Sequence, residues 1–333
     1  MKVPVISVVM SAYNAKEYLS QALDSILAQT FGDFEFIITN DGSTDDTQNV
    51  LEDYSRKDGR IKVIQQRNMG LTESLNQMVA IAKGEFIARM DADDISFPER
   101  FERQKRKFQD IPDYLAVGSW FQVVRKSNLP DCEIVFPDRP EILKKCLREG
   151  MNCYAHGSVM IRKAVFNELG FRYRFKFGQD MDLWLRLCER GPLGMVEEVL
   201  YQQRVHGRAL SQVLIPQRSA LMNIMLSLMK ERKTHGREIS DWKEEENKAL
   251  NGIPEWTEKE IEAYDLFLDA RRLLCSGNNV RARQILASIR GDLGEMRNIL
   301  LSYYISCLPG FITAPMLRFR DKINNKRCFV RHI

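Results

Sequence analysis

The sequence lacks the cysteine patterns of disulfide-rich and zinc-binding proteins. Its 333 residues include seven cysteines, and none of them forms a Cys-x-x-Cys pair or a Cys/His cluster with the spacing of a zinc site. An odd number of scattered cysteines also argues against a disulfide framework. Such usage is typical of a reducing compartment, so we expect a cytoplasmic protein.

A strong charge of one sign and an unbroken apolar segment are also absent. Basic residues number 49 and acidic residues 45, and the net charge of +4 argues against nucleic acid as a partner. The apolar run from Val3 to Met10 contains a proline and no good cleavage site, so it favours a buried strand over a signal peptide. The long uncharged stretch Asn298–Leu317 is interrupted by two prolines and a glycine, which disfavours a transmembrane helix.

Two nucleotide-binding signatures are missing. No Walker A sequence occurs, and no Gly-x-Gly-x-x-Gly opens a helix after a strand. A P-loop kinase and a typical dinucleotide-dependent dehydrogenase are therefore disfavoured.

The first 90 residues contain an alternation of apolar strands and amphipathic helices. Strands are expected at Val5–Met10, Phe34–Thr39, Ile61–Ile64 and Glu85–Met90, with helical apolar spacing between them. Asn14, followed by Glu17, resembles the N-cap of the first helix. This alternation predicts an α/β fold with a mostly parallel central sheet and helices on both faces. Such sheets bind ligands at the carboxyl ends of their strands.

The pattern of expected strands and helices changes in the second half of the chain. Strands are expected at Ala116–Val124, Ser158–Ile161 and Met195–Arg204, with a helix at Asp180–Arg190. After about residue 215 the strand signal disappears, and amphipathic helices are expected at Leu221–Met229, Glu258–Cys275 and Val280–Ile289. We therefore expect an α/β domain over residues 1–214 and a helical C-terminal region over residues 215–333.

The strongest chemical signal is Met90-Asp91-Ala92-Asp93-Asp94, which directly follows an expected strand. Like charges this close repel one another unless a cation neutralises them. Carboxylate oxygens suit Mg²⁺ or Mn²⁺, which are commonly held by one or two carboxylates together with substrate phosphates. A solvated acidic turn, or Asp94 as the cap of a helix near Pro98, is the alternative interpretation.

Three weaker signals lie elsewhere. In Asn40-Asp41-Gly42-Ser43-Thr44-Asp45 the hydroxyls can cap the next helix, whereas Asp41 can accept hydrogen bonds from a base or a ribose. Asp180 and Asp182 fall in the first turn of an expected helix, where the helix dipole favours negative charge. His206 follows the last expected strand, and a lone histidine is usually structural or exposed.

Together these segments resemble family 2 glycosyltransferases with a GT-A fold, of the bacterial cell-surface polysaccharide type. The resemblance covers roughly residues 3–213, and its motifs occur in the right order. The matching segments are Ser7–Asn14, Asn40–Asp45, Asn68–Leu71 with Asn76, Gly84–Ile87, Asp91–Asp94 with Pro98–Arg100, His156–Arg162, Gln179–Arg186, and His206 with Ser211.

The resemblance implies a site for a nucleotide-diphosphate sugar, most simply a UDP-sugar. Asp41 would contact the base. Asp91 would reach the ribose or the metal. The remaining residues implied in donor binding are Ala12, Tyr13, Asn14, Asn68, Asn76 and Ala92.

The resemblance also implies the catalytic groups. Asp91 and Asp93, with His206, would hold Mn²⁺ or Mg²⁺, and Asp180 would act as the general base, with Asp182 as the alternative. Trp184 and Arg186 would shape the acceptor side. The implied reaction transfers the sugar, with inversion, to a hydroxyl of a saccharide or lipid-linked saccharide.

Two other functions stay open at this point. A sugar-phosphate nucleotidyltransferase usually has a Gly-rich, basic loop after the first strand, where this chain has Ser11–Asn14. A non-catalytic binding protein with the GT-A fold is the second alternative. Finally, Arg318–Ile333 has six basic residues against Asp321, which fits peripheral contact with anionic lipid on the inner face of the cell membrane. A packed helix with a solvated tail explains that segment equally well.

Overall fold

The computed structural model describes residues 2–125, 132–172, 178–206 and 215–238, together with residues 279–289 and single positions between 263 and 273. The chain divides into two compact units, residues 1–255 with 275–277, and residues 256–274 with 278–333. The stretch Asn298–Leu317 and the basic tail Arg318–Ile333 lie outside the described residues. No helix within the described ranges has the length and apolar character needed to span a bilayer.

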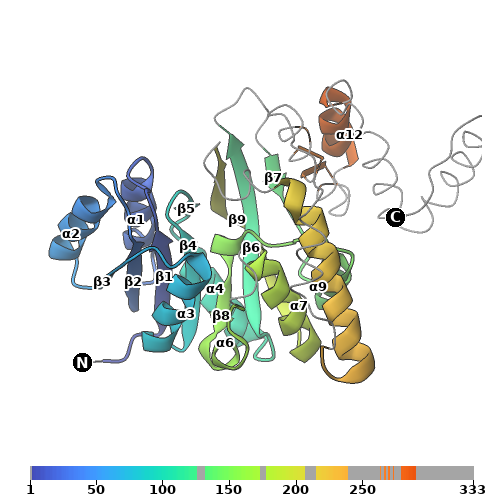
Figure 1. The fold of residues 1–333 in the computed structure, drawn as a ribbon, viewed down its shortest axis with the longest axis horizontal. Coiled ribbons are helices and arrows are strands. Elements are labelled where there is room, and N and C mark those ends of the chain that lie inside the picture. The colour runs from blue at the N-terminus through green and yellow to red at the C-terminus, as the bar shows by residue number, and fades with distance from the viewer. Residues whose placement is uncertain are drawn as a thin grey trace, which may run out of the picture. The chain divides into compact units, whose positions relative to one another are not determined.

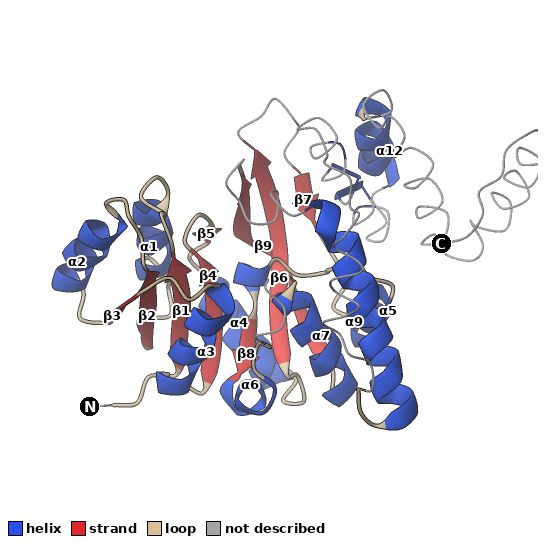
Figure 2. Ribbon diagram, viewed as in Figure 1, coloured by secondary structure: helices blue, strands red, loops and turns tan. Residues whose placement is uncertain are grey.

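The first unit is built on one sheet with the strand order β3-β2-β1-β4-β8-β6-β9-β5, and β7 pairs with β6 (Figures 1 and 2). The strands are β1 Ile6–Ala12, β2 Phe34–Asp41, β3 Ile61–Gln66, β4 Phe86–Asp91, β5 Ile95–Ser96, β6 Ala116–Arg125, β7 Cys132–Ile134, β8 Met160–Arg162 and β9 Leu193–Val205. The helices are α1 Leu19–Leu27, α2 Thr47–Lys57, α3 Leu71–Ile81, α4 Arg100–Asp110, α5 Pro140–Arg148, α6 Lys163–Leu169, α7 Gln179–Arg190 and α9 Ile215–His235, with the 3-10 turn η1 at His156–Ser158.

The amino-terminal half of the sheet confirms the expected α/β arrangement. The strands β3, β2, β1 and β4 are parallel, with β2 and β3 on one side of β1 and β4 on the other. Right-handed connections therefore place α1 and α2 on one face of the sheet and α3 on the opposite face. The strand order reverses between β1 and β4, and open α/β sheets bind ligands beyond the carboxyl ends of the strands at such a point.

The sheet as a whole is mixed, while its longer strands β1–β4, β6 and β9 run parallel to one another, as expected. The short strand β8 is inserted between β4 and β6 and runs antiparallel to both. The strand β9 is parallel to β6, and β5 and β7 pair antiparallel at the margins. The strands β6 and β9 therefore run in the same direction as β1–β4, and their ends reach the same edge as the β4 carboxyl end.

One local prediction is wrong. Asn14 does not cap α1, because the helix begins at Leu19 and Tyr18 occupies the N-cap position. The backbone of Asn14 has a φ of 48°, the left-handed conformation that asparagine tolerates better than most residues. The apolar face of the helix is as expected, since Leu19, Ala22, Leu23 and Ile26 are buried.

The helix α9 extends the first compact unit beyond the expected boundary at residue 214. It packs against α7, and Leu221, Ile224, Met225 and Leu228 are buried. In the second unit, α12 (Asn279–Ser288) matches the expected helix Val280–Ile289. The expected helix Glu258–Cys275 is described only at single positions, among which Ala263, Leu266, Phe267, Ala270 and Leu273 are buried at helical spacing.

Candidate active site

The acidic loop after β4 is held against the end of β9. Asp93 Oδ2 lies 3.0 Å from His206 Nε2. Asp94 is 3% exposed and accepts hydrogen bonds from the Tyr201 hydroxyl at 2.7 Å and from the backbone N–H of Arg204 at 2.8 Å. Asp94 is therefore neither a solvated turn residue nor a helix cap, since Glu99 occupies the N-cap position of α4.

Asp91 interacts with several charged side chains. Arg89, two residues earlier on the same face of β4, forms an ion pair with it through Nη1 and Oδ1. Burial raises the pKa of Asp91, Arg89 opposes this, and the negative charges of Asp93 and Asp180 raise it further. The turn η1 links this loop to α7, since Gly157 lies beside Asp91 and the His156 ring lies 6.2 Å from that of Trp184.

Asp180 is held by a side chain of the loop that precedes β8. Asn152 Nδ2 donates to Asp180 Oδ2 at 3.0 Å, and Asn152 Oδ1 accepts from the backbone N–H of Tyr154 at 3.1 Å. The alternative base, Asp182, is 1% exposed and is bonded to Arg186 and Arg172. Burial and these two partners keep Asp182 from a substrate, which leaves Asp180 as the candidate.

The loops after β1 and β2 form one connected rim. Asn14 Oδ1 accepts from the backbone N–H of Thr44 at 2.8 Å, and the Asn14 N–H donates to Ser43 Oγ at 3.0 Å. Tyr13 is 52% exposed on this rim, whereas Ala12 is buried. The predicted donor residues 12–14 therefore lie at the carboxyl edge of the sheet beside the Asn40–Asp45 turn.

Asp41 holds the loop that follows β3. Its carboxylate accepts hydrogen bonds from the backbone N–H groups of Met69 at 2.8 Å and Gly70 at 2.9 Å, and from Gln66 Nε2 at 2.7 Å. Asn68 lies in this loop and is exposed. The role of Asp41 as a base contact stays a prediction, and its visible role is to fix the loop that carries Asn68.

Two residues assigned from the resemblance have structural partners instead. Both polar atoms of the Asn76 amide bond to the backbone of Phe171, with Nδ2 donating at 2.9 Å and Oδ1 accepting at 3.1 Å. Arg186 is 5% exposed and donates to the carbonyls of Leu169 and Gly170. These bonds give both side chains a structural role, and donor binding by Asn76 and acceptor binding by Arg186 stay predictions.

Several buried polar atoms around Asp91 and α7 have no hydrogen-bond partner within the described ranges. They are Arg89 Nε and Nη2, His156 Nε2, Gln179 Oε1 and Trp184 Nε1. The His156 ring lies 6.2 Å from that of Trp184, and burial, together with Arg89, lowers the pKa of His156 well below its ordinary value. Each such atom costs about 1–3 kcal/mol when it is left unpaired, so this group favours a polar ligand nearby.

The predicted metal ligands assemble only in part. Within the described ranges, no three His, Cys, Asp or Glu side chains form a group that could hold a metal ion. Asp93 and His206 are paired, but the ion pair with Arg89 occupies Asp91. A pair of protein ligands in an acidic surrounding still fits Mn²⁺ or Mg²⁺, because these ions take further ligands from phosphates and water.

Four further residues, which belong to none of the motifs, shape this site. Arg89 precedes Asp91 by two positions on a strand, so strand alternation alone places both side chains on one face. Tyr201 and Arg204 precede His206 at the end of an expected strand. Asn152 lies in a segment without a motif, and no signal in the sequence identifies it.

The chain is similar to known glycosyltransferases. The family described as Glycosyl transferase family 2 matches residues 7–170. The putative glycosyltransferase EpsE of Bacillus subtilis is 34% identical over 60% of this chain and 73% of that protein. The O-antigen biosynthesis glycosyltransferase WbnJ of Escherichia coli is 31% identical over 62% of this chain and 81% of that protein.

Solved structures show the same fold at low identity. The chain superposes on Staphylococcus aureus TarS 1–349 in complex with UDP with a TM-score of 0.55 and 16% identity, covering 90% of this chain and 89% of that one. It superposes on the mannosyltransferase PcManGT of Pyrobaculum calidifontis, in complex with GDP-Man and Mn²⁺, with a TM-score of 0.53 and 16% identity, covering 92% and 86%. The motifs, the sheet with its acidic edge and these similarities agree, and the chain belongs to glycosyltransferase family 2 and has the GT-A fold.

Proposed function

We propose that the protein transfers a sugar from a nucleotide-diphosphate donor to an acceptor hydroxyl, with inversion, in the assembly of a cell-surface polysaccharide. One arrangement carries this proposal: in the turn η1, Gly157 lies beside Asp91 and His156 lies beside Trp184 of α7, so the acidic loop and the helix that bears Asp180 border the same turn. We therefore assign the carboxylates for a cation and the carboxylate for a proton to one site. The similarity to WbnJ, an O-antigen biosynthesis glycosyltransferase, supports the polysaccharide role.

The donor we propose is a UDP-sugar, bound along the rim formed by the loops after β1, β2 and β3. UDP occupies the TarS structure and GDP-Man the PcManGT structure, which supports a nucleotide donor in this fold. On this chain the rim offers the exposed ring of Tyr13 and the exposed Asn68. Aromatic faces of this kind stack on nucleotide bases.

Asp93 and His206 would hold Mn²⁺ or Mg²⁺, with Asp91 beside them. When bound, such an ion neutralises the diphosphate and the charge that develops on it as it leaves. The unpartnered atoms of Arg89, His156, Gln179 and Trp184 supply donors and acceptors for sugar hydroxyls. Satisfying them would recover the free energy that their burial costs.

Asp180 acts as the general base in this proposal. Asn152 holds Oδ2, and Oδ1 has no partner within the described ranges, so it can accept the proton of an acceptor hydroxyl. The acceptor oxygen forms a bond to the anomeric carbon as the bond from that carbon to the phosphate oxygen breaks. The electron pair leaves with the nucleoside diphosphate, and a single displacement from the opposite face inverts the configuration.

The proposal is tested by a thermal-shift screen of UDP-glucose, UDP-N-acetylglucosamine and GDP-mannose, with and without Mn²⁺. A donor that binds the native state raises its stability, so we expect a Mn²⁺-dependent increase in Tm with one donor. The Asp93→Ala variant should lose the Mn²⁺-dependent part of this increase. The absence of any donor-induced shift in the wild-type protein would contradict the proposed donor class.

The base is tested by Asp180→Asn, which keeps the size of the side chain and removes its basicity. A single general base contributes about 10²–10⁴-fold, so release of nucleoside diphosphate from the selected donor should fall by that factor while donor binding is retained. Wild-type turnover in this variant would refute the assignment. Formation of a nucleotide-sugar from a sugar phosphate and a nucleoside triphosphate would instead favour a sugar-phosphate nucleotidyltransferase.

A further inference from the structure

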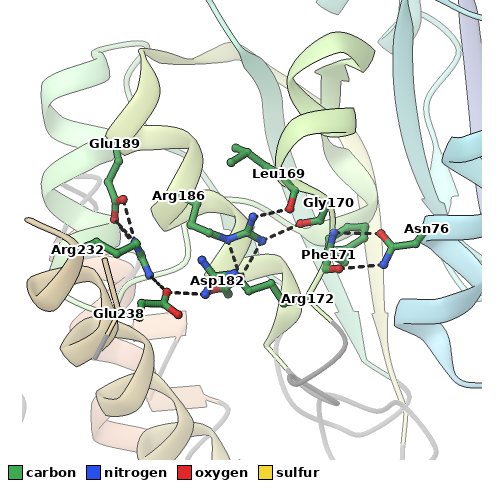
Figure 3. A network of polar contacts seen from close by, with 10 residues as sticks. All are labelled: Asn76, Leu169, Gly170, Phe171, Arg172, Asp182, Arg186, Glu189, Arg232 and Glu238. Carbon is green, nitrogen blue, oxygen red and sulfur yellow. Dashed lines mark hydrogen bonds and ion pairs between the residues drawn. The ribbon is translucent and has the colours of Figure 1, made fainter. Parts of the chain in front are cut away.

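The first turn of α7, which carries Asp180, is fixed by a network of charged side chains (Figure 3). Asp182 Oδ2 accepts from Arg186 Nε at 2.8 Å and lies 3.5 Å from Arg172 Nε. Arg186 also donates to the carbonyls of Leu169 at 2.8 Å and Gly170 at 2.7 Å. Leu169, Gly170 and Arg172 are thereby tied to the helix that bears the candidate base.

The same network reaches α9 and the residues that follow it. Arg172 and Arg232 both donate to Glu238, and Arg232 also pairs with Glu189 of α7, with Nη2 to Oε1 at 2.7 Å and Nε to Oε2 at 3.0 Å. Three carboxylates and three guanidinium groups balance one another in this network. Planar guanidinium groups that bind carboxylates through two hydrogen bonds hold a defined geometry as well as a charge.

The helix α9 also approaches the residue that precedes α7. Gly178 has a φ of +71°, and a β-carbon on it would lie 2.7 Å from Met225 Cε of α9. Gly178 is followed by Gln179 and then Asp180. The helix α9 therefore packs directly against the backbone that sets the direction of the Asp180 side chain.

We infer that Arg172 is a positioning residue for Asp180, and that residues 215–238 belong to the catalytic unit because they complete the network around it. This inference rests on the proposed function, in which Asp180 is the base. Arg172 links Asp182, two residues from the base, to Glu238 beyond α9. A small displacement of a catalytic group is costly, since about 1 Å can reduce the rate about 10²-fold.

Arg172→Met breaks this link without leaving a buried charge unpaired. Asp182 keeps Arg186 and Glu238 keeps Arg232, so the variant should fold. Arg172→Lys keeps the positive charge but loses the planar guanidinium group that can bind a carboxylate through two hydrogen bonds. The matched control is Arg190→Met at the other end of α7, where an exposed ion pair with Glu168 spans 3.6 Å.

We expect Arg172→Met to lower the kcat for the donor selected in the screen about 10–100-fold, with an unchanged donor KM. Arg172→Lys should restore part of the turnover, and Arg190→Met should match the wild-type protein. Amide hydrogen exchange in the first turn of α7 should become faster in Arg172→Met only, with exchange in β1–β4 unchanged. This exchange measurement needs no substrate, so it decides the inference even if the screen finds no donor.

Two outcomes would overturn the inference. In the first, amide hydrogen exchange in the first turn of α7 is as slow in Arg172→Met as in the wild-type protein. In the second, the kcat of Arg172→Met equals that of the wild-type protein. If Asp180→Asn is inactive in the same assay, the proposed function survives and only the positioning role of Arg172 fails. Full activity of Asp180→Asn would instead remove the base on which the inference rests.

Discussion

At the scale of single residues, the three aspartates of the acidic loop have different environments. Asp91 pairs with Arg89, Asp93 faces His206, and Asp94 accepts two hydrogen bonds inside the protein. Of the three side chains, those of Asp91 and Asp93 are 29% and 33% exposed. The motif therefore combines two partly exposed carboxylates with one that fixes the loop to β9.

Gly157 of the turn η1 lies beside both Tyr201 of β9 and Asp91. A β-carbon on it would be 1.8 Å from the Tyr201 hydroxyl oxygen and 3.0 Å from Asp91 Oδ2. We expect Gly157→Ala to lower the free energy of unfolding by about 1–3 kcal/mol, because overpacking forces such atoms apart. It should also reduce transfer. Urea unfolding measures the first effect, and nucleoside diphosphate release measures the second.

Gly59→Ala is the control for this prediction. A β-carbon on Gly59 would meet no atom within 4 Å, so its unfolding midpoint should stay close to that of the wild-type protein. Equal stability of the Gly157 and Gly59 variants would show that the space around Gly157 is larger than the structure indicates.

At the scale of elements, a buried glutamate joins β1, β2, β3 and the turn before β4. Glu35 accepts hydrogen bonds from the Ser7 hydroxyl at 2.7 Å, the Lys83 N–H at 2.7 Å and Lys62 Nζ at 2.6 Å. Burial raises the pKa of Glu35, but these bonds outweigh it and hold its pKa below the ordinary value of 4.5. The ionised form of Glu35 therefore stabilises the parallel half of the sheet.

The lowered pKa of Glu35 determines the direction in which the free energy of unfolding changes with pH. The unfolded chain binds a proton at Glu35 more readily, so the stabilisation is complete above the unfolded pKa and is lost as pH falls through the folded pKa. We expect Glu35→Gln to cost about 1.5–3 kcal/mol at neutral pH, because bonds to a charged group are lost. Urea unfolding should show this difference shrinking below about pH 4.

The exposed Glu52 of α2 provides the comparison for Glu35. Glu52→Gln should change stability little at any pH, since surface substitutions usually stay within about 0.5 kcal/mol. A Glu35→Gln difference that is constant from neutral to acidic pH would show that packing, rather than ionisation, accounts for its cost.

Local patterns were sufficient for most elements of the first unit. The strands at Phe34, Ile61 and Glu85 begin within one residue of β2, β3 and β4 because each is a short apolar segment between turn residues. The mixed pairing of β8 could not be predicted, since its three residues carry no signal for the direction of a neighbour. Asn14 was misassigned because a cap and a left-handed loop residue favour the same side chain.

The candidate site was predictable where its residues follow strands. Asp93 and His206 lie together as the resemblance implied, since the ends of β4 and β9 reach one edge. Contacts that depend on the packing of distant segments could not be predicted. Asn152 with Asp180, Asn76 with Phe171 and Arg172 with Asp182 are all such pairs.

At the scale of the whole molecule, the first compact unit includes α9 and comprises residues 1–255 with 275–277. A chain that ends after residue 214 lacks α9 and exposes the face of α7 that it covers. The buried side chains Leu221, Ile224, Met225 and Leu228 each contribute roughly 1.5–3 kcal/mol. We expect residues 1–255 to unfold in one cooperative transition, and residues 1–214 to be far less stable or insoluble.

Circular dichroism during thermal unfolding checks this comparison, with the full chain as the reference. Equal midpoints for the two shortened chains would show that α9 adds nothing to the first unit.

The hydrogen bonds between the loops after β1 and β2 have a consequence for how such an enzyme can diversify. Asn14 with Thr44 and Ala15 with Thr47 build that rim without help from α7 or α9. A preformed rim loses little conformational freedom when a nucleotide binds. In the proposed function this rim binds the nucleotide, so exchange of the chain after β4 between homologues should change the acceptor and leave the nucleotide preference unchanged.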